Sequence, residues 1–391
     1  MTVLFFACIG LIVYVYAGYP LLVTLLAKLR KPSQFVTPDT WPEVTLLIAA
    51  YNEEAVIANK LENSLALDYP AERLHILVAA DGSSDQTADI VHRFEPRGVA
   101  LSYEPARRGK MAAINRAFPN TRGDVIVFSD ANNLYDAGAI KALIRPFSDP
   151  TVGATTGAKR ILKGDGALGE SEGLYWKYES FIKKQETRLG CCTAVAGEII
   201  ALRRAAFVTP PDYVINDDFY MGMRLTRQGY RVVYVPEAHS FEPVSLSAED
   251  EVGRRARIVA GRYQAIALAH QLLPFKRPLI VWQIVSHKFL RPLVPLAMIG
   301  ALLSNLWLLL FPVSGQSVLW QQVAFILQIL FYAAAAIGSR LPKTHPLAKI
   351  LYLPTFLVQS NGAALIGLYR FLTGRQSVLW QRAPRQLQQS K

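Results

Sequence analysis

The sequence is poor in cysteine. Of its 391 residues only Cys8, Cys191 and Cys192 are cysteines, and two of these are adjacent. This number and spacing exclude a disulfide framework and a cysteine-based metal site, and they agree with a reducing environment for the central part of the chain. The chain also lacks a Gly-x-Gly-x-x-Gly motif after its first predicted strand, which argues against a dinucleotide-binding dehydrogenase.

Charged residues are also scarce. They make up 18% of the chain, against 51% hydrophobic residues, and the segments 1–27, 292–339 and 350–369 have none. Each segment is long enough to cross a membrane, which takes ~20 residues, and the middle one is long enough for two crossings. The first segment starts without a basic residue and is followed by Lys28, which favours a signal anchor over a cleaved signal peptide.

The remaining charge is mostly positive, with a formal net charge of +12. Many of the basic residues lie beside the uncharged segments, where anionic lipid headgroups favour them, so we expect membrane lipids and not nucleic acid as partners. The segment 274–292 mixes aromatic and aliphatic residues with basic ones such as Lys288 and Arg291, which predicts a helix lying in the membrane interface.

These patterns divide the chain into five regions. We expect a transmembrane signal anchor over 1–31, a cytoplasmic domain over 41–250, basic interfacial helices over 251–292, two to three transmembrane segments over 293–372 and a basic tail over 373–391. Four crossings would place the basic tail outside, against the positive-inside rule, so the number of crossings stays open. The polar residues in the last apolar segment suit either a re-entrant helix or a glycan path.

Strand and helix patterns alternate through the central domain. Short apolar runs at 44–50, 75–80 and 124–129 are separated by helical patterns. This alternation predicts an α/β domain with a mostly parallel sheet and helices on both faces. Sheets of this kind bind ligands at the carboxyl ends of their strands.

Polar side chains follow all three runs. Tyr51 and Glu53 follow the first run, Asp81 the second, and Asp130 and Asn132 the third. Each alone is ordinary turn chemistry, but together they predict a ligand site along one edge of the sheet. The oxygens of an aspartate and an asparagine separated by one residue suit a hard divalent cation.

Several motifs then occur in a characteristic order. They read IAAYNEE at 48–54, ADGSSD at 80–85, RGK at 108–110, DAN at 130–132 and NDDF at 216–219. This order resembles glycosyltransferase family 2 over residues 41–263. The flanking apolar segments resemble the membrane-bound polysaccharide synthases of that family, of the hyaluronan and cellulose synthase type.

The resemblance implies a nucleotide-sugar-binding domain of the glycosyltransferase A type. It implies an inverting enzyme that transfers a sugar, with a UDP-sugar as the expected donor, at the cytoplasmic face of the inner membrane. The acceptor would be a growing polysaccharide or a lipid-linked glycan. Two alternatives stay open: a lipid glycosyltransferase that adds a single sugar, and a non-catalytic, nucleotide-sensing subunit of a glycan export complex. A homodimer or an export partner is compatible with each.

The resemblance also assigns roles to residues. The donor-binding set would comprise Tyr51, Glu53, Asp81, Lys110, Asp130, Arg254 and Arg257. Asp81 would accept a hydrogen bond from the uracil imide, and Lys110 would place its charge near the phosphates. Asp130 and Asn132 stand where the family's Asp-x-Asp motif holds Mg²⁺ or Mn²⁺. Asn132 offers an oxygen without a charge, so a weaker metal affinity is expected.

The catalytic base, by the same resemblance, is Asp218. It would take the proton from the acceptor hydroxyl as that oxygen attacks the anomeric carbon. Gly197 and Glu198 would line the acceptor site, Gly197 by letting the backbone approach the sugar closely. The alternative for the NDDF motif is plain helix capping by Asn216 or Asp217, and both roles can hold together.

A last motif departs from the family pattern. Processive members have Gln-x-x-Arg-Trp where this chain has Arg254, Arg257 and Ile258 at the corresponding positions. The arginine for the diphosphate is kept. The aromatic face for stacking is lost, because isoleucine has none, and this favours the single-addition alternative.

Overall fold

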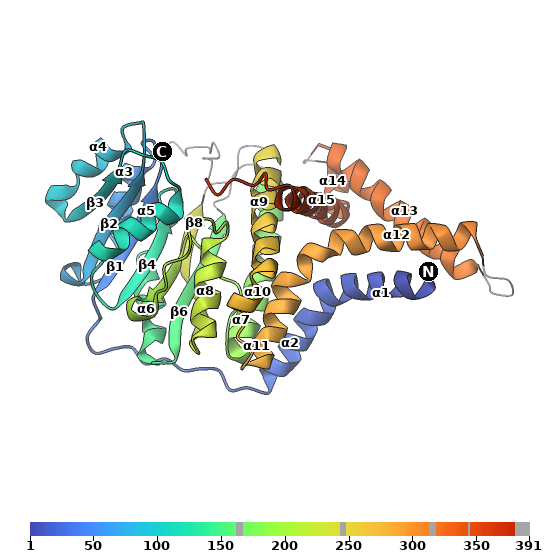
Figure 1. The fold of residues 1–391 in the computed structure, drawn as a ribbon, viewed down its shortest axis with the longest axis horizontal. Coiled ribbons are helices and arrows are strands. Elements are labelled where there is room, and N and C mark those ends of the chain that lie inside the picture. Colours follow the sequence, from blue (N-terminus) through green and yellow to red (C-terminus); the bar gives the residue numbers. More distant parts are fainter. Residues whose placement is uncertain (162–166, 243–247, 313–317, 343–344, 380–391) are drawn as a thin grey trace.

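The computed structural model describes residues 1–161, 167–242, 248–312, 318–342 and 345–379. Figure 1 shows two parts side by side: a twisted sheet with its helices, and a set of long helices that contains the N-terminus. The helices α7, α8 and α9 stand between the two parts.

The described strands form one sheet in the order β3-β2-β1-β4-β7-β6-β8-β5. Their bounds are β1 Val44–Ala50, β2 Leu74–Asp81, β3 Val99–Glu104, β4 Val125–Asp130, β5 Leu134–Tyr135, β6 Val152–Ile161, β7 Ile200–Arg203 and β8 Arg231–Glu242. Strands β3, β2, β1 and β4 run parallel, and so do β6 and β8. Strand β7 is antiparallel to β4 and β6, and β5 is antiparallel to β8. The predicted α/β class is confirmed, with a mixed sheet.

Helices cover both faces of this sheet. They are α3 Ile57–Leu65, α4 Thr87–His92, α5 Lys110–Ala117, α6 Ala139–Ile144, α7 Ala167–Leu189 and α8 Asp217–Arg227. Alternate residues of β1 point into different cores: Leu46 and Ile48 pack in the core that includes α3 and α6, and Leu47 in the core that includes α5 and α8. Because both of its faces are buried, every residue of β1 except Thr45 is apolar.

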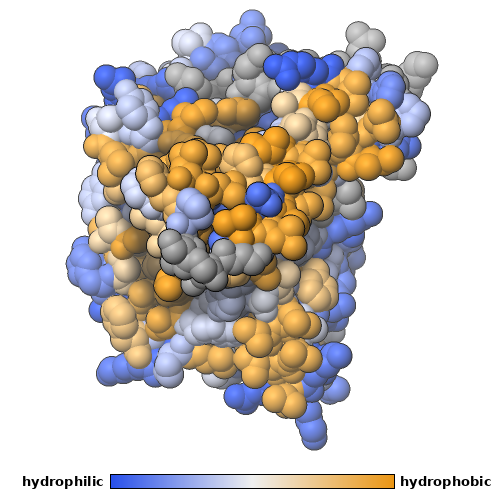
Figure 2. Space-filling view, turned by 90° about the vertical axis from the view of Figure 1, so that its right-hand side faces the viewer, coloured by the Kyte–Doolittle hydropathy of each residue, from blue (hydrophilic) through white to orange (hydrophobic). Residues whose placement is uncertain are grey.

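The second part consists mainly of long helices. Their bounds are α1 Thr2–Val13, α2 Tyr19–Lys28, α9 Ala248–Ala267, α10 Ala269–Leu272, α11 Pro278–Ile284, α12 Val294–Leu310, α13 Leu319–Arg340, α14 Pro346–Ile350 and α15 Tyr352–Leu372. Among the described residues, Thr2–Lys28, Pro278–Leu310 and Leu319–Arg340 are long and apolar enough to cross a membrane. Apolar side chains gather on the face that these helices present (Figure 2).

Helix α15 differs from these three. It covers the predicted segment 351–372 and is long enough to span a membrane, but its composition is not apolar enough for it to count as a spanning helix. It lies along α9 and α13. Its polar residues make contacts inside the protein: Ser360 bonds with Arg255 of α9, and the Asn361 amide donates to the Tyr16 hydroxyl at 3.0 Å.

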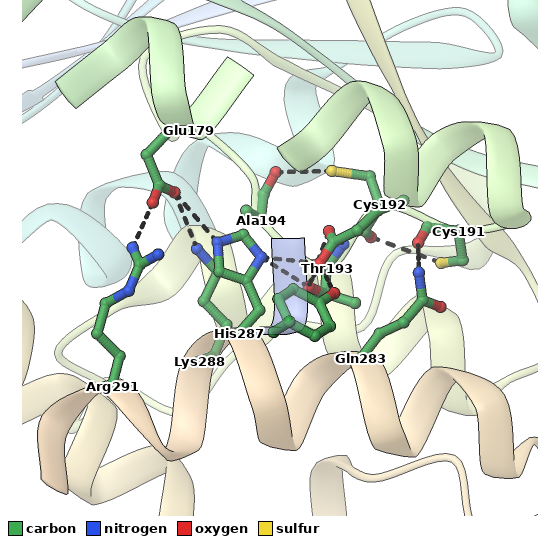
Figure 3. A network of polar contacts seen from close by, with 11 residues as sticks. Glu179, Cys191, Cys192, Thr193, Ala194, Gln283, His287, Lys288 and Arg291 are labelled. Carbon is green, nitrogen blue, oxygen red and sulfur yellow. Dashed lines mark hydrogen bonds and ion pairs between the residues drawn. The ribbon is translucent and has the colours of Figure 1, made fainter. Parts of the chain in front are cut away.

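The predicted interfacial segment also differs from expectation at its basic residues. We expected Lys288 and Arg291 to face lipid headgroups. Both side chains are instead largely buried, and they pair with Glu179 of α7 (Figure 3). The neighbouring His287 lies between Glu179 and Glu186. The expectation failed because the pairing glutamates are distant in the chain, so the local pattern reads as an exposed basic helix.

Candidate active site

The loops after β1 and β2 are tied together at the edge of the sheet. Asn52 has a φ of +52°, and its side chain accepts a hydrogen bond from the Ser84 backbone at 2.8 Å. Beside it, the Arg107 guanidinium lies 3.9 Å from the centre of the Tyr51 ring. Glu53 is buried, with its backbone N–H bonded to the Thr87 hydroxyl. Tyr51 and Glu53 therefore lie at the predicted edge, in a packed loop.

Asp81 connects the end of β2 to the turn before α5. Its side chain is buried, and its two oxygens accept hydrogen bonds from the backbone of Arg108 and Gly109 at 2.9 and 2.7 Å. A Cβ on Gly82 would lie 2.6 Å from the Arg107 backbone nitrogen, so only glycine fits there. In this structure Asp81 holds the turn that opens α5, and each of its oxygens can still accept a further hydrogen bond.

Lys110, the first residue of α5, lies between two carboxylates. Its Nζ is 2.6 Å from Asp130 Oδ1 and 3.7 Å from Asp217 Oδ2. Burial alone would lower the pKa of Lys110, but Asp130 and Asp217 outweigh it and hold that pKa above its usual value. Lys110 therefore stays cationic at the position predicted for phosphate binding.

A narrow pocket opens beside Lys110. Its lining comprises Gly109, Lys110, Met111, Asp212, Val214, Ile215, Asp217, Arg257 and Val378. The structure thus brings Arg257 together with Lys110, as the resemblance implied. Arg254 is instead held by Glu251, to which it donates two hydrogen bonds of 2.9 Å. Val378 was not expected at the site, because it belongs to the C-terminal segment.

Asp130 and Asn132 fit one half of a divalent-cation site. The Asn132 Oδ1 is buried and makes no hydrogen bond to any described residue, and the Asp130 side chain is 22% exposed. Within the described part of the chain, no group of three His, Cys, Asp or Glu residues could hold a metal ion by itself. Two protein oxygens suit Mg²⁺ or Mn²⁺, which commonly complete their coordination with substrate phosphates and water.

Asn133 and Lys60 are parts of the site that the sequence did not indicate. The Asn133 Oδ1 accepts hydrogen bonds from Lys60 Nζ at 3.2 Å and Ser129 Oγ at 3.0 Å. Its Nδ2 donates to the Glu198 carbonyl at 2.8 Å and to Ser240 Oγ at 2.7 Å. Burial lowers the pKa of Lys60 to about 7. Asn133 thereby fixes the end of β4 to the segment that contains Glu198.

Asp218 lies in the first turn of α8. Its Oδ1 accepts a hydrogen bond from the Phe219 backbone at 2.7 Å. Burial and the neighbouring Asp217 raise the pKa of Asp218 to about 6, against the opposing charge of Lys110. A carboxylate with this pKa is ionised at neutral pH and basic enough to accept a proton.

The predicted acceptor residues lie directly against this aspartate. A Cβ placed on Gly197 would be 3.1 Å from the Asp218 Cβ. Glu198 follows, with its Oε1 3.6 Å from the Nζ of the largely buried Lys159. The close approach predicted for Gly197 is therefore an approach to Asp218.

Asn216 connects this turn to α9. It occupies the N-cap position of α8 without a capping side-chain bond, and its Nδ2 donates to the Ile258 carbonyl at 2.8 Å. A Cβ on Gly261 would lie 2.4 Å from the Asn216 Cγ, so glycine allows α9 to pack this closely. The capping role proposed for Asn216 is wrong for its side chain.

Comparisons with known proteins agree with this arrangement. The poly-beta-1,6-N-acetyl-D-glucosamine synthase of Staphylococcus aureus (strain COL) is 30% identical over 215 residues, which cover 54% of this chain and 51% of that protein. The probable glycosyltransferase YdaM of Bacillus subtilis (strain 168) is 27% identical over 266 residues, covering 62% of this chain and 61% of that protein. The matched part thus spans about half of the length of the synthase.

A solved structure has the same fold over nearly the whole chain. The mannosyltransferase PcManGT from Pyrobaculum calidifontis, in complex with GDP-Man and Mn²⁺, superposes with a TM-score of 0.71 at 23% identity. The match covers 95% of this chain and 99% of that one. A family model described as glycosyltransferase like family 2 matches residues 42–260, more than half of the sequence. The chain therefore belongs to glycosyltransferase family 2 and is a glycosyltransferase.

Proposed function

We propose that this enzyme transfers a sugar, with inversion, from a nucleotide sugar to an acceptor hydroxyl at the cytoplasmic face of the inner membrane. The observation that supports the proposal most is the position of Asp218. Its carboxylate lies against Gly197 and close enough to Lys110 to feel its charge, and its pKa is raised to about 6. A base near a cation that can bind the leaving diphosphate suits a direct displacement at one carbon.

The residues of the site then divide the work. Lys110 and Arg257 would bind the diphosphate of the donor and balance its charge as it leaves. Asp218 would accept the proton of the attacking hydroxyl. Asp130 and Asn132 would hold a divalent cation, which supplies further positive charge to the leaving diphosphate.

A UDP-sugar is the donor that we propose, and a growing polysaccharide or a lipid-linked glycan is the acceptor. The S. aureus relative is named for a polymer of N-acetylglucosamine, which supports a glycan product. Ile258, which offers no aromatic face, favours addition of a single sugar to a lipid as the second candidate.

A donor panel tests the proposal. The full chain in nanodiscs of native lipid would be given UDP-sugars and GDP-sugars with Mg²⁺, Mn²⁺ or EDTA, and release of nucleoside diphosphate would be followed. We expect one donor to be consumed, EDTA to suppress its turnover, and product size to distinguish polymer from single addition. If the protein binds nucleotide but consumes no donor, even with extracted lipid and glycan acceptors, the proposal is wrong.

The pH dependence of turnover should report Asp218. Because Asp218 acts as a base only when ionised, kcat/KM should fall about tenfold per unit as the pH drops below about 6. Asp217→Asn removes the neighbouring negative charge and should move this acid limb to lower pH, whereas Lys110→Met should move it to higher pH. An acid limb that stays in place in both variants would assign it to another group.

Gly197→Ala should impair turnover without unfolding the protein. The added methyl would lie 3.1 Å from the Asp218 Cβ, so the aspartate must shift by a few tenths of an ångström. We expect kcat to fall about tenfold, because a small displacement of a reacting group lowers the rate strongly. The matched variant is Gly138→Ala, where a Cβ would meet no atom within 4 Å and where turnover should be unchanged.

A further inference from the structure

A buried polar cluster lies where α7 meets the membrane-side helix that begins at α11. We define the junction cluster as Tyr19, Glu179, Glu186, Thr193, His287, Lys288 and Arg291. Glu186 and Thr193 have no exposed surface, and His287 is 1% exposed. None of these residues lines the Lys110 pocket or touches Asp218, so the proposed chemistry does not account for them.

His287 joins the two glutamates of the cluster. Its Nδ1 lies 2.8 Å from Glu186 Oε1, and its Nε2 lies 3.3 Å from Glu179 Oε2. On one side, Glu179 also pairs with Lys288, at 3.5 Å, and with Arg291. These contacts join α7 to the π-helical turn Val285–Phe289 and to the residue that follows it by two. On this side one buried carboxylate therefore meets the side chains of three basic residues.

The other side of the cluster binds the loop between α7 and β7. The Glu186 carboxylate accepts hydrogen bonds from the Thr193 backbone N–H at 2.8 Å and from the Thr193 hydroxyl at 2.9 Å. It also accepts a bond of 2.5 Å from the Tyr19 hydroxyl, which belongs to the N-terminal helix. Gln283 of α11 donates to the Cys191 carbonyl at 3.3 Å, so the same loop is held from α11 as well as from α7.

This loop leads straight into the predicted acceptor residues Gly197 and Glu198. Four residues after Thr193 comes Gly197, which lies against Asp218. Between them, the Ala196 N–H donates to the Thr156 hydroxyl at 2.9 Å, and Val195 packs against Gly222 of α8, the helix that begins at the catalytic motif. A displacement of Thr193 would therefore be passed to the acceptor segment over a short, packed stretch.

We propose that Glu186 and His287 are positioning residues. They hold residues 193–197, and through them Asp218, in a fixed position relative to the membrane-side helices. The inference rests on the proposed function, because it explains how the acceptor side of that same site is kept in place. A buried carboxylate that accepts several hydrogen bonds would lose them if its partners moved, so the partners are restrained to one conformation. The loop is therefore fixed from the junction, and not by the sheet alone.

Two matched pairs of variants test this inference in the full chain in nanodiscs. His287→Ala removes the contact with Glu186. Lys288→Gln removes the charge of the adjacent buried lysine, which pairs with Glu179 and not with the loop. Thr193→Val removes the hydroxyl at almost constant shape, whereas Thr193→Ser keeps it. The readouts are amide hydrogen exchange over 193–198, binding of UDP and GDP with Mn²⁺, and kcat with the donor found in the panel.

We expect exchange over 193–198 to become about tenfold faster in His287→Ala and Thr193→Val, and to stay near wild type in Lys288→Gln and Thr193→Ser. Turnover should fall about tenfold in the first two variants while nucleotide binding is unchanged. Equal effects of His287→Ala and Lys288→Gln, or exchange over 193–198 unchanged in Thr193→Val, would overturn the inference. The exchange measurement needs no turnover, so failure of the proposed function would show separately, as a wild-type protein that consumes no donor.

Discussion

Asp218→Asn should lower kcat by about 10²–10⁴-fold while leaving nucleotide binding intact. The asparagine keeps the shape of the side chain and can still accept the hydrogen bond from Phe219, but it cannot take a proton. A general base of this kind accounts for a rate factor of that size. The measurement is single-donor turnover at pH 7.5, beside the affinity for the nucleoside diphosphate.

The neighbouring aspartate is the control. Asp217→Asn changes the same chemistry one residue away, in the same turn of α8, and removes a partner of Lys110. We expect it to retain most of kcat, because Asp217 faces the pocket and not Gly197. The anionic donor should bind at least as tightly, because the substitution removes a carboxylate that competes with the diphosphate for Lys110. If Asp217→Asn abolishes turnover and Asp218→Asn does not, the base has been assigned to the wrong residue.

The sequence predicted the strand ends well because the chemistry there is local. Apolar runs at 44–50 and 124–129 became β1 and β4 almost residue for residue, since each is buried on both faces and ends in a polar turn. Lys110 and Arg257 were placed by motif order, and the structure brings both to one pocket. What the motifs could not show is which partner each charge takes, as Arg254 with Glu251 illustrates.

Buried charge was the part that the sequence could not predict. Lys60 lies on a helix with polar neighbours and looks like a surface lysine, but it is fully buried against Asn133 and Tyr135, which follow β4. His287 and Lys288 look interfacial for the same reason. A local pattern reports the period of a helix and its average polarity, whereas the burial of one charged side chain depends on a partner from a distant segment.

The largest effect on stability should come from that buried charge. The Glu179 side chain is 4% exposed and meets His287, Lys288 and Arg291. Burial alone would raise the pKa of Glu179, but these basic groups outweigh it and hold that pKa well below its usual value. Glu179→Gln would leave the charges of Lys288 and Arg291 buried without this counter-charge, so we expect a loss of about 3–5 kcal/mol in the free energy of unfolding.

The same substitution at an exposed glutamate provides the comparison. Glu62 pairs with Arg97 through contacts of 2.5 and 2.9 Å, but both side chains are about half exposed, so Glu62→Gln should leave stability unchanged within error. Denaturant titrations of both variants in nanodiscs would measure the difference in stability. Equal midpoints would show that the charge of Glu179 does not stabilise the junction cluster.

The pH dependence of stability supplies an independent check on Glu179. A carboxylate with a depressed folded pKa stabilises the protein above its unfolded pKa, near 4.5, and this contribution is lost as the pH falls from there toward the folded value. Wild-type stability should therefore decline more steeply below pH 4.5 than that of Glu179→Gln, which has no carboxylate to protonate at this position. Parallel curves for the two proteins would mean that other carboxylates dominate the acid response, and the charge at Glu179 would then not be what holds α7 to the membrane-side helix.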